Sequence, residues 1–382
     1  MNKAFKYRVY PTKNQILLLE QTFGCARYVW NAILAWRSEE YSVRKTPINY
    51  TKTSAYLTTL KEEQPFLTEV SSVALQQALR NQDVAFSNFF AKRGSYPNFK
   101  RKHGKQSFRL VSSGFNMRDG KLYIAKSKEP LKIKDSRPLQ GSPTSITISK
   151  DCAERYFISI LCTVETEPLP ALSKSVGVDV GVSHFAITSD GEKFDNLRLT
   201  KKHEQKLSKL QRRLAKKTKG SKNRAKAKLK IAKLHAKIAD TRRDYLHKIS
   251  TKLINENQVI CLEDLNVSGM LQNHKLAKAI VDCGWTDFNN MLAYKAAWYA
   301  RTISKVSPWY PSSQICSTCG YRAGKKHLGI RHWNCSNCGA THDRDINAAI
   351  NILTAGQAEL ACGETVRPTR GVSLIETGTS RL

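Results

Sequence analysis

The stretch "VGVDVGVSHFAITSDGEKF", from Val176 to Phe194, decides the fold of the second half of the chain. It predicts two apolar strands joined by a tight turn, because β-branched and other apolar residues fill both runs. Asp179 is the only charged residue inside the first run. A carboxylate is costly to bury unless it is paired or binds a metal ion. The stretch therefore predicts a sheet that carries a carboxylate, although Asp179 could instead cap a turn.

Two more carboxylates stand at the ends of predicted elements. "NQVICLEDL" is a short apolar strand that ends in Glu263 and Asp264. "DRDINAAINI" predicts a helix that Asp345 begins, and the first-turn amides of a helix favour an anion. Taken singly, Glu263 could be an ordinary strand-end residue and Asp345 an N-cap. Neither residue alone indicates a functional site.

Asp179, Glu263 and Asp345 together form a more specific pattern. Hard divalent cations such as Mg²⁺ prefer carboxylate oxygens as ligands. Two such ions about 4 Å apart can hold the attacking water and the leaving oxygen of a phosphodiester. Three acids from separate strands and a helix can build that site. The pattern therefore predicts two-metal phosphodiester hydrolysis with Mg²⁺ as the cofactor.

Four of the ten cysteines are clustered in "CSTCG" and "CSNCG". Two C-x₂-C pairs separated by fifteen residues are formed by Cys316, Cys319, Cys335 and Cys338. This spacing is typical of a zinc ribbon. Four thiolates complete the tetrahedron and leave no position for a catalytic water, so the Zn²⁺ is predicted to be structural. The nearby His332 and His342 are interpreted as phosphate contacts or surface residues.

The charge of the chain is strongly positive, with 63 Lys+Arg against 31 Asp+Glu and a formal net charge of +32. A charge of this size repels itself unless a polyanion neutralises it, so a nucleic-acid partner is predicted. An anionic membrane surface is the alternative, but the basic residues are spread along the chain without a lipidation motif. No apolar run predicts a membrane span, and the N-terminus lacks a secretory signal, so we expect a cytoplasmic protein.

Residues 201–248 are dense in Lys and Arg, and "KGSKN" interrupts them. Leucines and isoleucines at helical spacing on both sides predict a basic helical hairpin. A solvated hairpin without a partner is the alternative, which is disfavoured because few acidic residues balance the charge. The residues expected to contact nucleic acid are Lys201, Lys202, Arg212, Arg213, Lys216, Lys217, Arg224 and Lys230.

The first 170 residues predict a helical and a β-rich part. "KAFKYRVYP" is a strand ended by Pro11, and a helical region follows in which a break near Gly24 predicts two helices instead of one. From about Tyr96, period-two alternation predicts a small antiparallel β barrel or sheet that the first strand could join. The proline-bearing linker "ETEPLPALSKS" then marks a domain boundary.

These residues resemble one known family. "GVDVGV", "CLEDLNV" and "HDRDINAAINI", with the four-cysteine ribbon between the second and third, are similar to the RuvC-like nuclease of TnpB proteins. TnpB proteins form the OrfB group of IS200/IS605-type transposons and are relatives of the Cas12 effectors. "YRVYPTKNQ", "GCARYVWN", "YPNFKRK" and "PSSQICSTCG" are also typical of the family. The resemblance covers nearly the whole chain.

The resemblance implies an RNA-guided DNA endonuclease. A guide RNA from the transposon end pairs with one strand of double-stranded target DNA, the protein reads a short adjacent motif, and one RuvC site cuts both strands. It also implies one protein per RNA, in a bacterial or archaeal cytoplasm and associated with the nucleoid. An RNA-guided DNA-binding regulator that does not cut is the alternative. A transposase with a tyrosine nucleophile is disfavoured, because no His-hydrophobe-His motif stands beside a tyrosine.

Carried over by position, Asp179, Glu263 and Asp345 are the metal ligands, Asp343 and Asp264 are their neighbours, and Asn347 orients the site or a phosphate. The fold implied is mixed and multidomain: an RNase H-like (RuvC) α/β nuclease with an inserted zinc ribbon, plus an N-terminal β-barrel (wedge) domain that carries a helical recognition insertion. The expected ranges are 1–10 and 95–170 for the barrel, 11–94 for the helical insertion, 171–305 and 343–360 for the nuclease, 306–342 for a ribbon that binds target nucleic acid, and 361–382 for a disordered tail.

Overall fold

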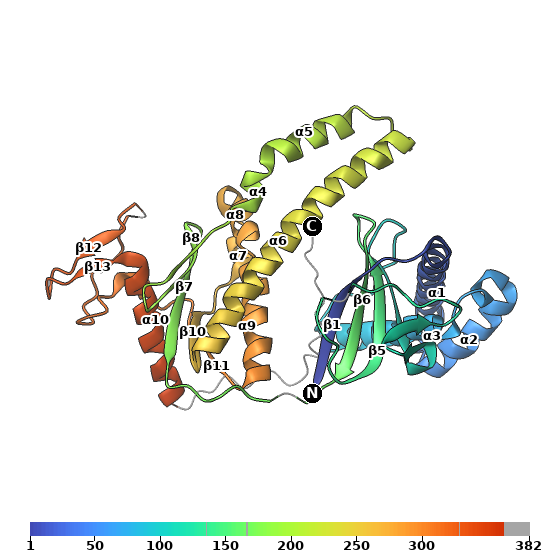
Figure 1. The fold of residues 1–382 in the computed structure, drawn as a ribbon, viewed down its shortest axis with the longest axis horizontal. Helices are drawn as coiled ribbons and strands as arrows, with labels where there is room; N and C mark the ends of the chain where they lie inside the picture. Colours follow the sequence, from blue (N-terminus) through green and yellow to red (C-terminus); the bar gives the residue numbers. More distant parts are fainter. Residues whose placement is uncertain (135, 166, 328, 363–382) are drawn as a thin grey trace. The chain divides into compact units, whose positions relative to one another are not determined.

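The computed structural model describes residues 1–134, 136–165, 167–327 and 329–362 (Figure 1). These residues divide into two compact units, one that ends at Glu165 and one that follows it. Of the predicted disordered tail, residues 363–382 lie outside the described residues, and Ala361 still belongs to a helix. No helix within the described ranges has the apolar length needed to cross a bilayer.

The first unit contains a four-stranded antiparallel sheet in the order β1-β6-β5-β2. The prediction of a barrel is not confirmed, because β1 and β2 stand at opposite edges and no sheet formed by the described residues closes. A separate hairpin, β3-β4, follows β2. The strands are β1 (Asn2–Val9), β2 (Gln106–Val111), β3 (Phe115–Arg118), β4 (Lys121–Ile124), β5 (Ser142–Lys150) and β6 (Tyr156–Thr163).

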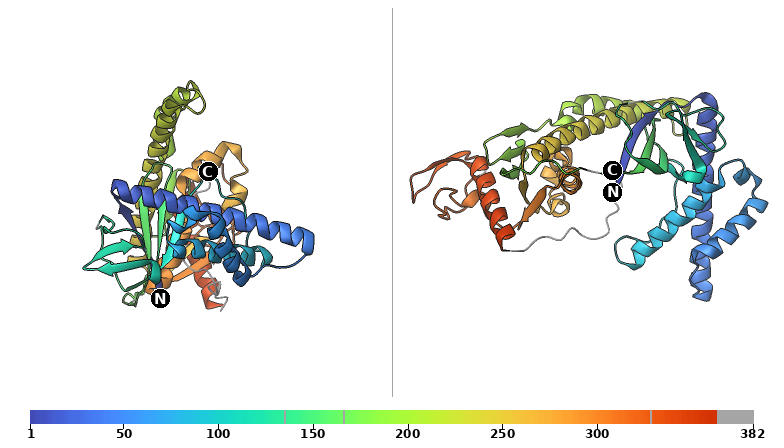
Figure 2. Two further views of the ribbon diagram at one scale, coloured as in Figure 1. Left: turned by 90° about the vertical axis from the view of Figure 1, so that its right-hand side faces the viewer. Right: turned by 60° about the horizontal axis from the view of Figure 1, so that its bottom comes forward.

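The helices of this unit are α1 (Lys13–Arg44), α2 (Tyr50–Glu63) and α3 (Ser72–Phe90). Helices α1 and α3 pack on the sheet, and α2 packs on these two helices. Short 3-10 turns occupy Pro65–Thr68 and Ser112–Gly114. The predicted break near Gly24 is wrong, since α1 is one continuous helix (Figure 2). A glycine inside a helix costs only about 0.5–1 kcal/mol relative to alanine. The buried side chains of α1 on both sides of Gly24 offset that cost.

The second unit is built on a five-stranded mixed sheet in the order β11-β10-β7-β8-β9. The first three strands in sequence are antiparallel, whereas β10 runs parallel to β7 and β11 parallel to β10. Parallel neighbours need long crossover connections, which the helices between β9 and β11 supply. The strands are β7 (Ser175–Val180), β8 (His184–Thr188), β9 (Lys193–Asp195), β10 (Val259–Glu263) and β11 (Thr302–Val306).

The sheet is covered by helices on both faces. Side chains alternate along a strand, so Ile260 and Leu262 of β10 pack in the core formed with α6 and α9. Cys261, between them, packs on the opposite face with Ile352 of α10. The helices of this unit are α4 (Leu199–Lys202), α5 (Glu204–Ala215), α6 (Lys222–Glu256), α7 (Val267–Met270), α8 (His274–Cys283), α9 (Trp285–Tyr299) and α10 (Arg344–Ala361). A 3-10 turn (Ser312–Gln314) and two short strands, β12 (His332–Asn334) and β13 (Thr341–Asp343), precede α10.

Helices α5 and α6 form the hairpin that the basic segment predicts, and they project from the sheet of their unit (Figure 1). Leu207 and Leu210 of α5 pack against Leu234 and Ile238 of α6. The second helix extends to Glu256, beyond the predicted end at residue 248. Its last part is buried against the sheet, so α6 is both an arm of the hairpin and a core helix.

Helix α10 approaches β7 at a glycine. A Cβ atom at Gly177 would lie 2.0 Å from the carbonyl oxygen of Ala349 and 2.6 Å from the amide nitrogen of Leu353. Both are backbone atoms of α10, which cannot rotate away as a side-chain end could. Gly356 of α10 makes a similar approach to Cys261 of β10. The two glycines therefore permit direct packing of the helix on the strands.

Substitution of Gly177 by alanine should force α10 away from β7 and destabilise the second unit. Overpacking of this kind costs typically about 1–3 kcal/mol and sometimes more. Gly24→Ala is the matched control, because no atom lies within 4 Å of a Cβ at Gly24. The control should stabilise α1 by about 0.5–1 kcal/mol. Thermal unfolding of both variants measures the difference, and a Gly177→Ala protein that melts like the wild type would contradict the close packing.

Candidate functional site

The predicted acids Asp179 and Glu263 stand side by side on neighbouring strands. β7 and β10 are parallel, and Val178 is the register partner of Leu262. One residue further along each strand, Asp179 and Glu263 therefore share one face of the sheet. Both acids are half-buried.

The third predicted acid reaches the same place from α10. The contact between Gly177 and Ala349 fixes the height of α10 on β7. Asp179 lies two residues beyond Gly177, about 6.6 Å along the strand. Asp345 lies four residues before Ala349, about 6 Å along the helix. The packing thus brings Asp345 to the end of β7 that carries Asp179.

The three carboxylates affect one another electrostatically. Burial raises the pKa of Asp179 well above its usual range, and the negative charges of Glu263 and Asp345 raise it further. The guanidinium groups of Arg344 and Arg331 act in the opposite direction but do not cancel the rise. A cation among these carboxylates would relieve the repulsion, which is the charge pattern of a divalent-metal site.

Glu263 is held by a serine from the segment before the ribbon. The Ser312 hydroxyl donates a hydrogen bond of 2.7 Å to Glu263 Oε1. Burial raises the pKa of Glu263, and this hydrogen bond lowers it in part. Ser312 is itself buried. One oxygen of Glu263 therefore has a fixed position.

Asp343, and not Asp345, is the N-cap of α10. Its Oδ1 accepts hydrogen bonds from the backbone amides of Asp345 (3.0 Å) and Ile346 (3.2 Å), and its Oδ2 pairs with Lys193 Nζ at 2.6 Å. Burial alone would raise the pKa of Asp343, but Lys193 and the two amides lower it overall. The alternative interpretation of Asp345 as the cap is wrong, and its carboxylate is available for other partners.

Arg331 occupies both oxygens of Asp345. Its Nη1 donates to Oδ1 and Oδ2 at 3.1 and 3.0 Å, while its Nη2 donates to Ser183 Oγ at 2.9 Å. Among the described residues, only the four cysteines bring three or more ligand atoms within 4.8 Å of one another. The carboxylate oxygens of Asp179, Glu263 and Asp345 are therefore not all within 4.8 Å of one another in this structure.

The four predicted zinc ligands are clustered. Cys316 Sγ and Cys338 Sγ are 3.7 Å apart, as are the sulfurs of Cys319 and Cys335. Tetrahedral zinc with Zn–S bonds of about 2.3 Å places sulfurs about 3.8 Å apart, so the donor set fits zinc. Donation from Asn337 and from the backbone of Tyr321 lowers the pKa of Cys319 to about 6. The backbone of Ala340 lowers the pKa of Cys338, but the neighbouring sulfurs outweigh it and raise this pKa overall, so metal binding must displace a proton there.

His342 is not a surface residue, contrary to prediction. It is buried, with Nε2 3.0 Å from Cys316 Sγ and its ring 4.7 Å from that of Trp333. Its imidazole is therefore part of the ribbon core and not a phosphate contact. His332 is exposed.

Asn347 is also buried and does not face a phosphate. Its Oδ1 accepts from the Ser317 amide at 2.9 Å, and its Nδ2 donates to the Ile315 carbonyl at 2.7 Å. Asn351, one turn later, donates to the carbonyls of Ser312 and Ile315, each at 2.8 Å. The two asparagines therefore attach the first cysteine pair to α10, and Asn347 orients the ribbon instead of a phosphate.

The other predicted residues have contacts of their own or face solvent. Asp264 is exposed and pairs with Lys305 at 2.9 Å. Arg224 differs from the prediction, since its Nη1 donates to the carbonyls of Leu214 (3.0 Å) and Lys217 (2.7 Å) and so joins the two hairpin helices. The remaining predicted nucleic-acid contacts are exposed: Lys201, Lys202, Arg212, Arg213, Lys216, Lys217 and Lys230.

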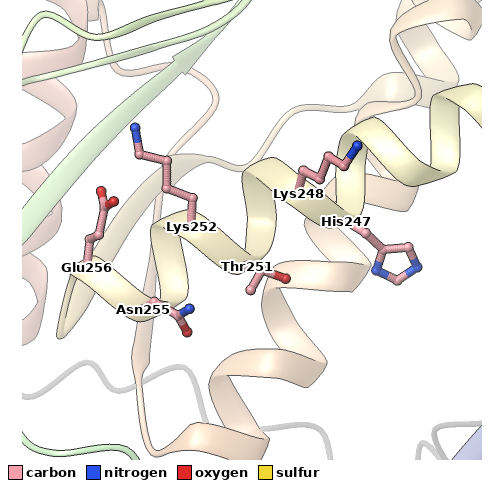
Figure 3. A pocket seen from close by; sticks show the side chains of 6 residues that line it. All are labelled: His247, Lys248, Thr251, Lys252, Asn255 and Glu256. Atoms are coloured by element: carbon pink, nitrogen blue, oxygen red, sulfur yellow. The ribbon is translucent and has the colours of Figure 1, made fainter. Parts of the chain in front are cut away.

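A surface hollow along α6 involves different side chains (Figure 3). Its lining residues lie on consecutive turns of that one helix. Lys252 forms an ion pair with Glu192, and the Thr251 hydroxyl and the His247 carbonyl accept from the buried Lys295 of α9. These contacts hold α6 in its unit, and none of the three acids lines the hollow.

Ser312, Arg331 and Asn351 are functional candidates that the sequence did not indicate. Ser312 begins a short 3-10 turn and Arg331 precedes β12, and neither periodicity nor spacing in the sequence marks them. Asn351 had a recognisable signal: two asparagines four residues apart on an otherwise apolar helix face need hydrogen-bond partners.

Three protein families match the chain. The OrfB_IS605 family, described as "Probable transposase", matches residues 159–274. The Cas12f1-like TNB domain matches residues 285–352, which include the cysteine ribbon and the start of α10. The helix-turn-helix domain of OrfB_IS605 matches residues 1–46, where the structure has strand β1 and the single helix α1.

Full-length relatives are also similar. A Streptomyces pristinaespiralis protein named "Putative RNA-guided DNA endonuclease" is 48% identical and covers 97% of this chain and 93% of its own length. "Putative RNA-guided DNA endonuclease InsQ" of Escherichia coli K12 is 34% identical and covers 96% of both chains. The Cas12f1 chain in a cryo-EM complex with sgRNA and target DNA aligns with a TM-score of 0.57 at 12% identity, over 92% of this chain and 98% of that one. The fold is shared with that protein.

The substitution Asp179→Asn should stabilise the metal-free protein. An acid whose folded-state pKa is raised costs stability as pH rises above its ordinary range, because the unfolded chain ionises more readily. Asparagine removes that cost. For a unit of this size, each kcal/mol of unfolding free energy shifts the melting temperature by about 2–4 °C. Thermal unfolding in EDTA between about pH 5 and about pH 8 should show that Asp179→Asn melts at a higher temperature than the wild type, by an amount that grows with pH.

Asp244→Asn is the control for this experiment, because Asp244 is exposed and pairs with Lys248 on the same helix face. Its melting temperature should stay close to that of the wild type. Added Mg²⁺ should raise the melting temperature of the wild type more than that of Asp179→Asn. An Asp179→Asn protein that is less stable than the wild type in EDTA would contradict the repulsion.

The double substitution of Cys316 and Cys319 by serine should remove the zinc. Elemental analysis of the wild type should find about one zinc ion per chain. Amides between Ser312 and Asp343 should exchange faster in the variant, because metal binding supplies folding free energy to such small modules. Cys152→Ser is the control, since Cys152 is exposed and outside the cluster. A wild-type protein without zinc would overturn the assignment.

Proposed function

The chain belongs to the OrfB family of IS605-type elements, and on that premise we propose that it is an RNA-guided DNA endonuclease. A guide RNA selects the target by base pairing, and the protein cuts the double-stranded DNA next to a short adjacent motif. Relatives over nearly the whole chain carry the name of this activity, and the fold shared with Cas12f1 supports it. The meeting of three acids from β7, β10 and α10 is the observation that carries the cutting step.

We infer that Asp179, Glu263 and Asp345 are the catalytic residues of an RNase H-like (RuvC) nuclease. Their carboxylate oxygens are the ligands that Mg²⁺ prefers, and the raised pKa of Asp179 reflects a site short of positive charge. Two Mg²⁺ ions held there would supply an activated water and stabilise the leaving oxygen of the phosphodiester. Ser312 fixes one oxygen of Glu263, and the Asp343 cap leaves the Asp345 carboxylate free of helix capping.

In this proposal the ribbon is structural and helps to present DNA to the acids. Its cysteines contact no acid of the site, but its leading segment supplies Ser312 and its later segment supplies Arg331. The exposed cations of the α5–α6 hairpin would line the channel for the guide–target duplex. The first unit, with its open sheet and three helices, would grip the guide RNA and read the adjacent motif, with one protein per RNA.

An RNA-guided regulator that binds DNA without cutting is the second candidate. A regulator that does not cut has no need to hold three mutually repelling carboxylates together at the ends of β7 and β10 and the start of α10. Repelling carboxylates lower the stability of the folded protein, and strongly perturbed pKa values are typical of functional sites. The complete acidic set therefore favours the endonuclease.

Asp179→Ala should abolish Mg²⁺-dependent cleavage of guide-matched duplex DNA. We expect the rate constant to fall at least about 1,000-fold, which corresponds to about 4 kcal/mol of lost transition-state stabilisation. Binding of the same DNA should change little, as measured by a mobility shift with Ca²⁺ in place of Mg²⁺. Asp264→Asn is the control, because that neighbouring acid pairs with Lys305, and it should cut within a few-fold of the wild type. Full cleavage by Asp179→Ala would refute the site, and binding without cleavage by the wild type would favour the regulator.

A further inference from the structure

Trp309 is exposed to an unusual degree. Its side chain is 90% exposed, while the other five tryptophans are buried or half-buried. A tryptophan with most of its surface in water forgoes the burial that stabilises its neighbours in sequence. Such a residue is a candidate for contact with a partner.

The turn that carries Trp309 is rigid. The Tyr310 amide donates to the Ser307 carbonyl at 3.0 Å, and the Trp309 amide donates to Ser307 Oγ at 3.3 Å. Pro308 fixes its own φ angle. Tyr310 is anchored in the small core formed with Val306. The backbone around the indole is thus fixed before any partner arrives.

Both ends of this turn are attached at Glu263. Val306 is the register partner of Glu263 between β11 and β10, and Ser312 donates to Glu263 Oε1. Trp309 lies midway, three residues from each end, so its backbone is within about 10 Å of both by the reach of the chain. The backbone that carries the exposed indole is therefore held close to the candidate active site.

We propose that Trp309 stacks on a base of the single DNA strand that occupies the candidate active site. An indole offers a flat apolar surface that any base can stack on, so it contributes positioning without sequence preference. The net charge of +32 favours a nucleic acid over a second protein as the occupant. The inference rests on the proposed function. It assigns Trp309 as a positioning residue that places the scissile phosphate near the acids.

The test uses the full protein with its guide RNA and a target DNA in which 2-aminopurine replaces single bases near the cut. Ca²⁺ in place of Mg²⁺ keeps the DNA intact. In the wild type, one or two positions should lose fluorescence by stacking. Trp309→Ala should restore the fluorescence at those positions, and Trp309→Phe should restore it only in part. In Mg²⁺, Trp309→Ala should cut about 5- to 160-fold more slowly, the range expected for one lost stacking contact.

Leu276→Ala is the control, because Leu276 of α8 is also an exposed apolar residue of the second unit (47% exposed). It should leave both readouts unchanged. Equal quenching and equal cleavage in Trp309→Ala and the wild type would overturn the proposal. A change of oligomeric state in Trp309→Ala would also overturn it, because it would indicate a protein partner for Trp309. Failure of the wild type to cut would instead refute the proposed function, so the two failures are distinguishable.

Discussion

The close packing of helix α10 on strand β7 sets the geometry on which the candidate site depends. Gly177 lets backbone approach backbone, and this contact fixes the height at which α10 begins. A larger residue would displace Asp345 together with the helix, although Gly177 itself touches no acid. The carboxylates repel one another, so only the surrounding fold holds them together. The free energy for this arrangement comes from the apolar cores on the two faces of the sheet.

The cysteine ribbon and the acids are joined by specific hydrogen bonds. Asn347 and Asn351 of α10 hold the segment from Ser312 to Ser317, and Ser312 in turn holds Glu263. Arg331 reaches from the other side of the ribbon to Asp345. The four-cysteine cluster, whose donor set fits zinc, is therefore linked to the side chains around the acids that we propose as ligands of a harder metal. This explains in physical terms why two different kinds of metal ligand follow each other so closely in the sequence.

The three acids were recognisable in the sequence, whereas the residues that contact them were not. Asp179 and the cysteines are marked by local signals. A charged residue is unusual inside an apolar strand, and the C-x₂-C spacing is typical of a zinc site. Ser312 and Arg331 act across the chain, so no local pattern marks them. The prediction of a barrel was not confirmed because alternation predicts strands but not whether the edges of a sheet meet. The predicted break at Gly24 was wrong because one glycine does not end a well-packed helix. Arg224 shows that composition cannot separate a cation that binds carbonyls of its own hairpin from one that faces solvent.

The central claim is that Asp179, Glu263 and Asp345 together bind divalent metal where a phosphodiester is cut. Anomalous diffraction from crystals of the protein with guide RNA and target DNA, soaked in Mn²⁺, tests it most directly. The account predicts two manganese peaks about 4 Å apart, with oxygens of all three acids as ligands and a phosphate between them. Manganese elsewhere, with Arg331 still paired to Asp345 and no ion at Asp179, would contradict it.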